Sequence, residues 1–418
     1  MGTNYRRSLA AMRGFVVSGV QKAAPGVQRG HDVTLPQVSL GTGDGLAENP
    51  VTLHWEAHVF TRLKSIFSTS GGNSSADNDI RLNVYATVSP LPKPTFPHAL
   101  LGERDLSDPE LHGHLEGFIG YTLSRGDGEM THTRYHVMRH LQRVQHHVSL
   151  MLSSSALPEF ARWACQANAI VFDDDGRICD PEGRVLIDSQ GAGDPAAELP
   201  YPADALERKS RSEARLLADG IALSGSLPPI ISENEVQWRT ADEVAGRVMA
   251  LLAVSAFAEG IRDNDPLDLG QIRERLPAAF SYFSQAEQAF LQAATPDTHV
   301  VTQMGWRYES TAILAWAAGL WPELPSPGEI CDVSGLTGHL LDASAHGLPP
   351  THGLRPANEI LDALDETIRW HWVIREAELG RREFPPNVIP GVIRERHHAL
   401  NWLVRFERAD WDDVTTPT

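Results

Sequence analysis

In two stretches of the first half of the chain, apolar and polar residues alternate with a period of two. In "RLNVYATVS" the residues Leu82, Val84, Ala86 and Val88 fall on one face of an extended chain. The stretch "HLEGFIGYTL", residues 114–123, shows the same alternation. Because successive side chains of a strand point to opposite faces of a sheet, both stretches are predicted to be β-strands with one buried face.

Further elements of both kinds follow before residue 188. Apolar spacing predicts a helix through "RYHVMRHLQRVQ", a strand in "HVSLML" and a helix through "PEFARWACQAN". A strand in "AIVF", a turn at "DDDG" and a final strand in "RVLI" complete the series. This mixture predicts an α/β domain with an open sheet over residues 51–187.

Two segments lack periodicity. Residues 1–50 are rich in Gly, Gln, Ser and Pro, which predicts a loosely ordered extension without chemistry of its own. The stretch "DSQGAGDPAAELPYPADALE", residues 188–207, is filled with Gly, Pro, Ala and acidic residues. Such composition between two periodic regions predicts a linker, so residues 188–207 are taken to separate two folded domains.

Beyond residue 207 the apolar spacing becomes helical. Apolar residues after Thr240 keep to one side until Gly260, and "PANEILDALDETIRWHWVIREAELG" predicts a long amphipathic helix with Pro356 in its first turn. Three S/T-x-x-E capping boxes mark predicted helix starts: Ser210 with Glu213, Thr240 with Glu243, and Ser284 with Glu287. The predicted fold class is therefore α+β, an N-terminal open-sheet α/β domain followed by an all-α domain over residues 208–418.

The charge of the chain narrows the choice of partners. It carries 54 acidic and 36 basic residues, a formal net charge of -18. This charge repels phosphate backbones and anionic lipids, so neither a nucleic acid nor a membrane is an expected partner. It suits a basic protein partner, because complementary fields speed encounter and set specificity. Simple solubility explains the same charge equally well.

The number of cysteines and the length of the apolar stretches indicate where in the cell the protein is located. Cys165, Cys179 and Cys331 are too few and too scattered for a disulfide framework, and none belongs to a C-x-x-C pair. No stretch reaches the roughly 18 apolar residues of a membrane span, and the N-terminus lacks an uninterrupted apolar core followed by a small-residue cleavage site. A cytoplasmic location is therefore expected.

Three histidines on the predicted helix are the sharpest metal candidates. His132, His136 and His140 are spaced four apart and so share one helix face, and imidazole is a common metal ligand. However, Arg134 and Arg139 stand where negative charge would help a cation. Solvated or partly buried histidines without a metal are the favoured interpretation. No glycine pattern for nucleotide binding occurs in a supporting context, so no cofactor is expected.

The segment "RERHHALNWLVRFERADWDD" concentrates histidine, asparagine and tryptophan. On a helix from about residue 392, one stripe is apolar except for a histidine: Ile393, His397, Leu400 and Val404. His397 and Asn401 are one turn apart, which favours a buried polar network over a catalytic pair. Four more residues complete this candidate structural or functional motif: Glu395, Trp402, Trp411 and Asp412. Trp402 is predicted to be a core residue, and Asp412 or Asp413 to cap or pair.

The same segment carries a family resemblance. The stretches "RSEARLLADGI", "WRTADEVAGRVMALLAV", "WRYESTAILAWAAGL" and "ERHHALNWL", followed by "WDD", resemble the bacterial domain-of-unknown-function family 4272 over residues 208 to 418. The NWL and WD motifs of the family fall on Asn401, Trp402, Leu403, Trp411 and Asp412. The family supplies no established catalytic residue. Its longer members look like immunity proteins, cytoplasmic inhibitors of toxins that are delivered by type VI secretion or related systems.

The resemblance implies a non-enzymatic inhibitor whose partner is a cognate toxin, commonly a basic nuclease domain. An alternative is a metal-dependent hydrolase of unknown substrate, which would use either the three helical histidines or the Glu395, His397 and Asn401 cluster. A third is an adaptor with several partners.

Overall fold

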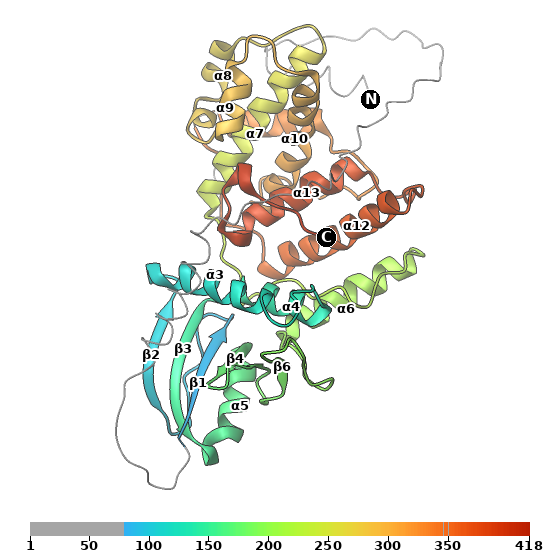
Figure 1. Cartoon of the computed structure of the whole chain (residues 1–418). Coiled ribbons are helices and arrows are strands. Elements are labelled where there is room, and N and C mark those ends of the chain that lie inside the picture. Colours follow the sequence, from blue (N-terminus) through green and yellow to red (C-terminus); the bar gives the residue numbers. More distant parts are fainter. Residues whose placement is uncertain (1–78, 346, 350) are drawn as a thin grey trace, which may run out of the picture. The chain divides into compact units, whose positions relative to one another are not determined.

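The computed structural model describes residues 79–345, 347–349 and 351–418, and the predicted extension over residues 1–50 lies outside this range. Residues 79–418 fall within one compact unit, which contains both the sheet and the helical region. Figure 1 follows the chain from the sheet into the helices. The α+β fold class is confirmed, with the strands confined to the N-terminal part of the described residues.

The sheet has six strands in the order β2-β3-β1-β4-β5-β6, and every neighbouring pair is antiparallel. Its strands are β1 (Asp79–Ala86), β2 (Ala99–Asp105), β3 (His146–Ser153), β4 (Ala169–Asp173), β5 (Ile178–Cys179) and β6 (Val185–Ile187). The central strand β1 pairs Val84 with Val148 of β3 and with Val171 of β4. Strands at these positions were predicted from "RLNVYATVS", "HVSLML", "AIVF" and "RVLI", and all four are confirmed.

Helices cover both faces of the sheet (Figure 1). Leu82, Val84 and Ala86, which the alternation places on one face, pack with Phe160 and Trp163 of α5 (Leu157–Gln166). The opposite face packs against α3 (Pro109–Leu123) and α4 (His132–Leu141). Burial of alternate residues on opposite faces explains why the strand pattern of β1 was visible in the sequence.

The prediction of a strand at residues 114–123 was wrong, because this stretch is the C-terminal part of α3. Its buried residues include Leu111, Leu115 and Phe118, and this spacing defines one face of a helix. Phe118 would have pointed away from the predicted strand face. The Asp108 side chain accepts a hydrogen bond from the Glu110 amide at 2.8 Å, and Pro109 occupies the first turn. This helix-start signal at Asp108 and Pro109 precedes residues 114–123, whose alternation led to the wrong prediction.

Three similar turns shape the edge of the sheet that contains β5 and β6. Asp173, Asp180 and Asp188 each accept two backbone hydrogen bonds, from the amides two and four residues later, at 2.8–3.0 Å. A glycine three residues after each aspartate has a positive φ between 78° and 84°. Aspartate stabilises such turns and glycine tolerates this φ, so the D-x-x-G spacing sets the hairpins. The turn predicted at "DDDG" is confirmed.

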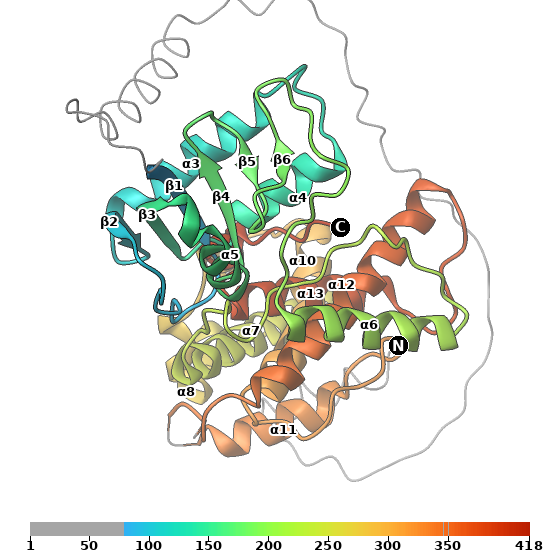
Figure 2. The same cartoon turned by 90° about the horizontal axis from the view of Figure 1, so that it is seen from below.

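The C-terminal part of the described chain is helical. Its helices are α6 (Ala203–Ala218), α7 (Ala241–Arg262), α8 (Leu269–Arg275), α9 (Gln285–Gln292), α10 (Thr298–Ala317), α11 (Val333–Ala343), α12 (Ala357–Leu379) and α13 (Pro390–Leu403). Helices α7 and α10 make the two largest contributions to the central apolar core. Helix α13 packs on α10 and α12, and α6 lies beside α12 (Figure 2). Helix α6 begins within the predicted linker over residues 188–207.

The capping boxes of Thr240 with Glu243 and of Ser284 with Glu287 begin α7 and α9 as predicted. The third box was wrong, because Ser210 lies inside α6, where the backbone amides already have partners. Pro356 is the N-cap of α12, directly before its first turn, and α7 extends two residues beyond Gly260.

The expectation that no stretch is apolar enough for a membrane span was wrong: helix α7 is long and apolar enough to cross a membrane, the one such helix in the described part of the chain. Its apolar window is 89% buried inside the protein. Residues on all sides of α7, including Val244, Ala250 and Leu252, belong to the central core. Packing against neighbouring helices therefore accounts for its apolar composition.

One carboxyl group lies within this core. Glu259 of α7 is fully buried, and the Tyr308 hydroxyl donates to its Oε2 atom at 2.8 Å. Burial raises the pKa of Glu259 from 4.5 to about 7, against the lowering influence of Tyr308 and Arg262. The folded protein therefore keeps a proton that the unfolded chain has already released between these two pKa values.

Glu259→Gln should remove this pH dependence. Since the folded pKa is the higher one, the free energy of unfolding of the parent falls as pH rises from 4.5 to about 7. We expect the variant to gain up to about 3 kcal/mol over the parent at about pH 8 and much less at about pH 5, as measured by urea denaturation. The exposed Glu274→Gln serves as the control. An equal gain at both pH values would contradict this assignment.

Candidate functional site

A cavity of about 620 Å³ lies where α4, the segment 226–237 and helices α12 and α13 approach one another. This volume is in the range of small-molecule sites. Its apolar walls include Leu227, Pro228, Leu364, Ile368, Trp372 and Phe406. Polar side chains also reach it, among them His136, Arg143, Tyr201, Glu235, His397 and Asn401. Residues from both the sheet region and the helical region are therefore brought to one place.

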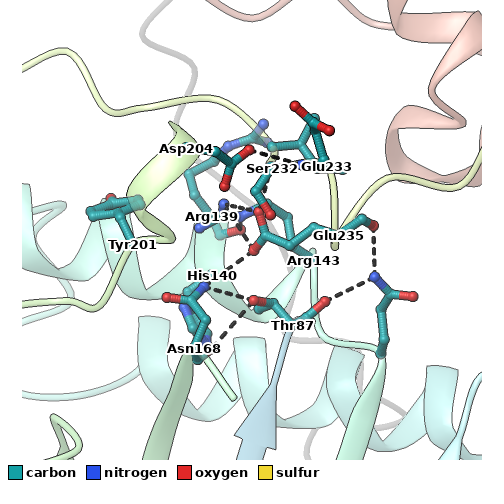
Figure 3. Close-up of polar contacts among 12 residues, drawn as sticks. Thr87, Arg139, His140, Arg143, Asn168, Tyr201, Asp204, Ser232, Glu233 and Glu235 are labelled. Atoms are coloured by element: carbon teal, nitrogen blue, oxygen red, sulfur yellow. Dashed lines mark hydrogen bonds and ion pairs between the residues drawn. The ribbon is translucent and has the colours of Figure 1, made fainter. Parts of the chain in front are cut away.

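The Glu235 carboxylate is the centre of the polar contacts at the sheet side of the cavity (Figure 3). Its side chain is fully buried, and Arg143 Nη1 lies 3.3 Å from each carboxylate oxygen. Asn168 Nδ2 donates to Oε1 at 3.2 Å, and the Ser232 amide donates to Oε2 at 2.7 Å. Burial acts to raise the pKa of Glu235, but Arg143 and the hydrogen bonds from Thr87 and Ser232 hold it below 4.5. The group is therefore a satisfied, ionised carboxylate.

Backbone hydrogen bonds join the same segment to the ends of the strands. The Ser89 amide donates to the Asn234 carbonyl at 2.7 Å. Gln145 Nε2 donates both to the Glu235 carbonyl at 2.6 Å and to the Thr87 carbonyl at 2.8 Å. The segment that lines the cavity is thereby fixed to β1 and to the start of β3.

Sequence reasoning missed this cluster. Asn168 follows α5 with a φ of 46°, and its amide also donates to Thr87 Oγ1 at 2.7 Å. Asparagine tolerates the left-handed conformation, so an asparagine between a predicted helix and a predicted strand was a usable signal for a helix end. Nothing in the pattern around Glu235 indicated that its carboxylate is buried. Partners up to 92 residues away in sequence satisfy it.

The α4 histidines have separate partners. His136 Nδ1 lies 2.6 Å from the Tyr201 hydroxyl, whereas His140 Nε2 lies 3.1 Å from the Tyr85 carbonyl oxygen. His132 is exposed, and its ring centre lies 4.1 Å from that of His136 with the two rings tilted by 41°. Burial lowers the pKa of both His136 and His140 to about 4. In the described part of the chain, no group of three or more His, Cys, Asp or Glu side chains is arranged to hold a metal ion.

The α13 residues His397, Asn401 and Glu395 also point to different partners. His397 Nδ1 lies 2.7 Å from His371 Nδ1 of α12, and both rings are buried. Asn401 Nδ2 donates to the carbonyl of Thr415 at 2.8 Å. Glu395 accepts from Ser310 at 2.6 Å and pairs with Arg307 on α10, outside the cavity lining. His397 and Asn401 reach the cavity, but the three side chains do not form one catalytic cluster.

The predicted apolar stripe on α13 is confirmed. Ile393, His397, Leu400 and Val404 are all buried. Burial lowers the pKa of His397 well below its usual value, and the neighbouring His371 acts in the same direction. The histidine pair is therefore held in its neutral form at neutral pH, and one ring donates to the other.

Trp402, Trp411 and Asp412 stabilise the packing of the helical region. The two indole rings meet edge to face at 5.5 Å, and Trp411 is 4% exposed. Arg239 lies over Trp402 and Arg247 over Trp411, each at 4.7 Å from the ring centre. Asp412 Oδ2 accepts from the Ala286 amide in the first turn of α9 at 2.9 Å. The NWL and WD motifs thus make core and capping contacts.

Glu235→Ala should destabilise the fold by about 3 to 5 kcal/mol, because it leaves the Arg143 guanidinium and the Asn168 amide without their buried acceptor. Glu235→Gln keeps acceptor and donor atoms and should cost less. The matched control is Glu233→Ala, two residues earlier, which removes an exposed side chain. Urea denaturation of the three variants measures the effect, and equal stability of Glu235→Ala and Glu233→Ala would refute it.

His397→Ala should cost about 1 to 3 kcal/mol, because His371 loses its hydrogen-bond partner inside the core. The double variant with His371→Ala should lose less than the sum of the two single losses, since the interaction can be lost only once. Denaturation of the four proteins tests this coupling. If the His397→Ala protein were as stable as the parent but had lost the function of the protein, His397 would instead be a functional residue.

Comparison with known proteins supports the family resemblance found in the C-terminal sequence. Residues 208–414 match the family described as "Domain of unknown function (DUF4272)". No curated protein and no solved structure gave a significant match. The matched range contains Glu235, His397, Asn401 and both tryptophans of the NWL and WD motifs. Residues 208–414, just under half of the chain, are therefore similar to the domain of unknown function family DUF4272.

Proposed function

We propose that this protein is an inhibitor that binds a basic protein partner and blocks it without chemical modification. In this proposal the partner is a cognate toxin, with a nuclease domain delivered by type VI secretion as the leading case. The surface charge of the protein carries the proposal. The resemblance of longer family members to immunity proteins supplies the kind of partner.

The acidic excess lies entirely outside the core. Residues 79–418 contain 49 acidic and 29 basic side chains. Six acidic residues are buried: Asp180, Glu235, Glu259, Glu287, Glu309 and Asp365. Six arginines are also buried: Arg134, Arg208, Arg239, Arg247, Arg369 and Arg396. Because the interior is formally balanced, the whole excess of negative charge is available to attract a basic partner.

The residues considered for catalysis have structural partners. His136 and His140 bind different oxygen atoms, and Glu395 pairs with Arg307 on α10. Since no converging set of donors among residues 79–418, apart from the two positions not described, favours the metal-dependent hydrolase, the binding function is preferred. A cytoplasmic location is part of the proposal, because such an inhibitor acts where the toxin would act. Three free cysteines agree with a reducing compartment.

The test begins with a search for a secreted nuclease gene beside the gene of this protein. The purified chain is then titrated against the purified toxin domain of such a nuclease. Nuclease activity should fall to background at an equimolar ratio and return when the complex is dissociated. The association rate should fall steeply between about 0.05 M and about 0.5 M salt, with much less change in the dissociation rate. Inhibition at catalytic amounts, or inhibition that persists after removal of this protein, would refute the proposal.

A conservative variant separates binding from catalysis. Glu395→Gln keeps the acceptor for Ser310 but removes the charge that a hydrolase would use. For a stoichiometric inhibitor, this variant should inhibit at the same equimolar ratio as the parent. Its thermal unfolding is measured in parallel, so that any loss of folded protein is known. Loss of inhibition by a fully folded Glu395→Gln protein would favour the enzyme alternative.

A further inference from the structure

We propose that the 620 Å³ cavity between α4, the segment 226–237 and helices α12 and α13 binds a small organic anion with an apolar body, such as an aromatic carboxylate. This ligand site is separate from the proposed binding of a basic toxin. A basic partner is attracted by the acidic exterior, whereas the cavity has the opposite local charge.

The walls of the cavity suit an apolar body. Ile368 and Trp372 of α12 lie on one side, and Leu227 and Pro228 of the segment 226–237 also line it. Phe406 contributes a further ring. Small-molecule sites combine such apolar surfaces with a few polar groups that fix orientation. A ligand that is polar throughout would leave these walls without favourable contacts.

The charged residues of the lining favour an anion. Five arginines line the cavity, Arg139, Arg143, Arg369, Arg405 and Arg408, against three glutamates, Glu116, Glu235 and Glu407. This ratio is the reverse of that in residues 79–418 as a whole, where acidic side chains outnumber basic ones by 49 to 29. A local excess of cations inside an acidic protein attracts anionic ligands to that place.

Arg408 is the cation best placed to meet such an anion. Arg139 pairs with Glu407, Arg143 with Glu235, and Arg405 with Glu243. Arg369 is held by Asp365 at 2.8 Å through two of its nitrogens. No hydrogen bond or ion pair engages the Arg408 guanidinium within the described part of the chain. Its donors are therefore available, and a guanidinium matches a carboxylate with two parallel hydrogen bonds.

The backbone that carries Arg408 is strained. Arg405, Glu407 and Arg408 have φ values of 52°, 52° and 56°, the left-handed region that non-glycine residues rarely adopt. Such conformations persist where the surrounding contacts enforce them, and they concentrate at functional positions. Here Glu407 is held by Arg139 and Gln142 of the sheet region. The strained turn sets Arg408 at the cavity.

Two buried polar side chains can complete the recognition of the anion. His397 and Asn401 line the cavity one helical turn apart on α13. His397 uses Nδ1 toward His371, which leaves Nε2 as its remaining ring nitrogen. Asn401 directs its Nδ2 atom to Thr415. These groups are positioned by core contacts, so they need little rearrangement to accept a ligand.

The test uses the full chain alone and three probes that separate charge from shape. We expect 2-naphthoate to bind in isothermal titration calorimetry and to raise the melting temperature. Naphthalen-2-ylmethanol, which keeps the ring without the charge, should bind about tenfold more weakly. Acetate, which keeps the charge without the ring, should show no binding at the same concentration.

Two pairs of variants place the site. Arg408→Gln should weaken 2-naphthoate about tenfold and leave the alcohol unchanged, whereas Arg381→Gln should change neither. Arg381 is the matched control, because it is exposed, has a φ of 49° and lies outside the lining. Leu227→Trp should fill the cavity and abolish binding of both naphthalene probes. Its control is Leu379→Trp at an exposed position outside the lining.

The proposal fails if the parent chain does not bind 2-naphthoate, or if a folded Leu227→Trp protein binds it as well as the parent does. Equal affinity for 2-naphthoate and for the alcohol would overturn the assignment of an anion. Equal effects of Arg408→Gln and Arg381→Gln would overturn the role of Arg408. Since no toxin is present in these measurements, their outcome is independent of the proposed inhibitor function.

Discussion

The arrangement of the described chain depends on one buried carboxylate. Glu235 lies in the range that matches the family model, yet Arg143 and Asn168 of the sheet region satisfy its oxygens. An ionised carboxylate can remain inside a protein only if charge and hydrogen bonds replace its hydration. The sheet and the helices must therefore meet at this point. The cavity lies beside this contact, since Glu235 and other residues of the segment 226–237 line it.

Charge is divided sharply between interior and surface. Among the residues that the structure describes, the interior holds equal numbers of acidic residues and arginines, as in the buried pair of Arg247 with Glu287. The surface carries the whole acidic excess, while arginines predominate in the lining of the cavity. These separate electrical environments allow one protein to attract a basic macromolecule outside and a small anion inside. The two proposals therefore use different parts of the molecule.

The family motifs have a structural explanation. Trp402 and Trp411 contact each other, and arginines lie over both rings. Asp412 pairs with an amide at the start of α9. A motif that draws residues 286 to 412 together specifies packing, because each partner is needed to bury the others. The presence of this motif therefore indicates the fold of the domain and does not indicate a particular activity.

The sequence by itself determined the elements whose pattern is local. The alternation of apolar and polar residues predicted β1, and helical spacing of apolar residues predicted α12 and α13. Capping side chains three residues apart predicted the starts of α7 and α9. The same local reasoning failed at residues 114–123, where glycines spaced among apolar residues imitate a strand. By contrast, helical spacing correctly predicted that His397 lies on the buried stripe of α13. Only the tertiary structure decided that Glu235 meets Arg143, that His397 meets His371, and that the candidate catalytic residues diverge. Those contacts join segments from 26 to 92 residues apart, and a local pattern carries no information about which distant partner satisfies a buried polar group.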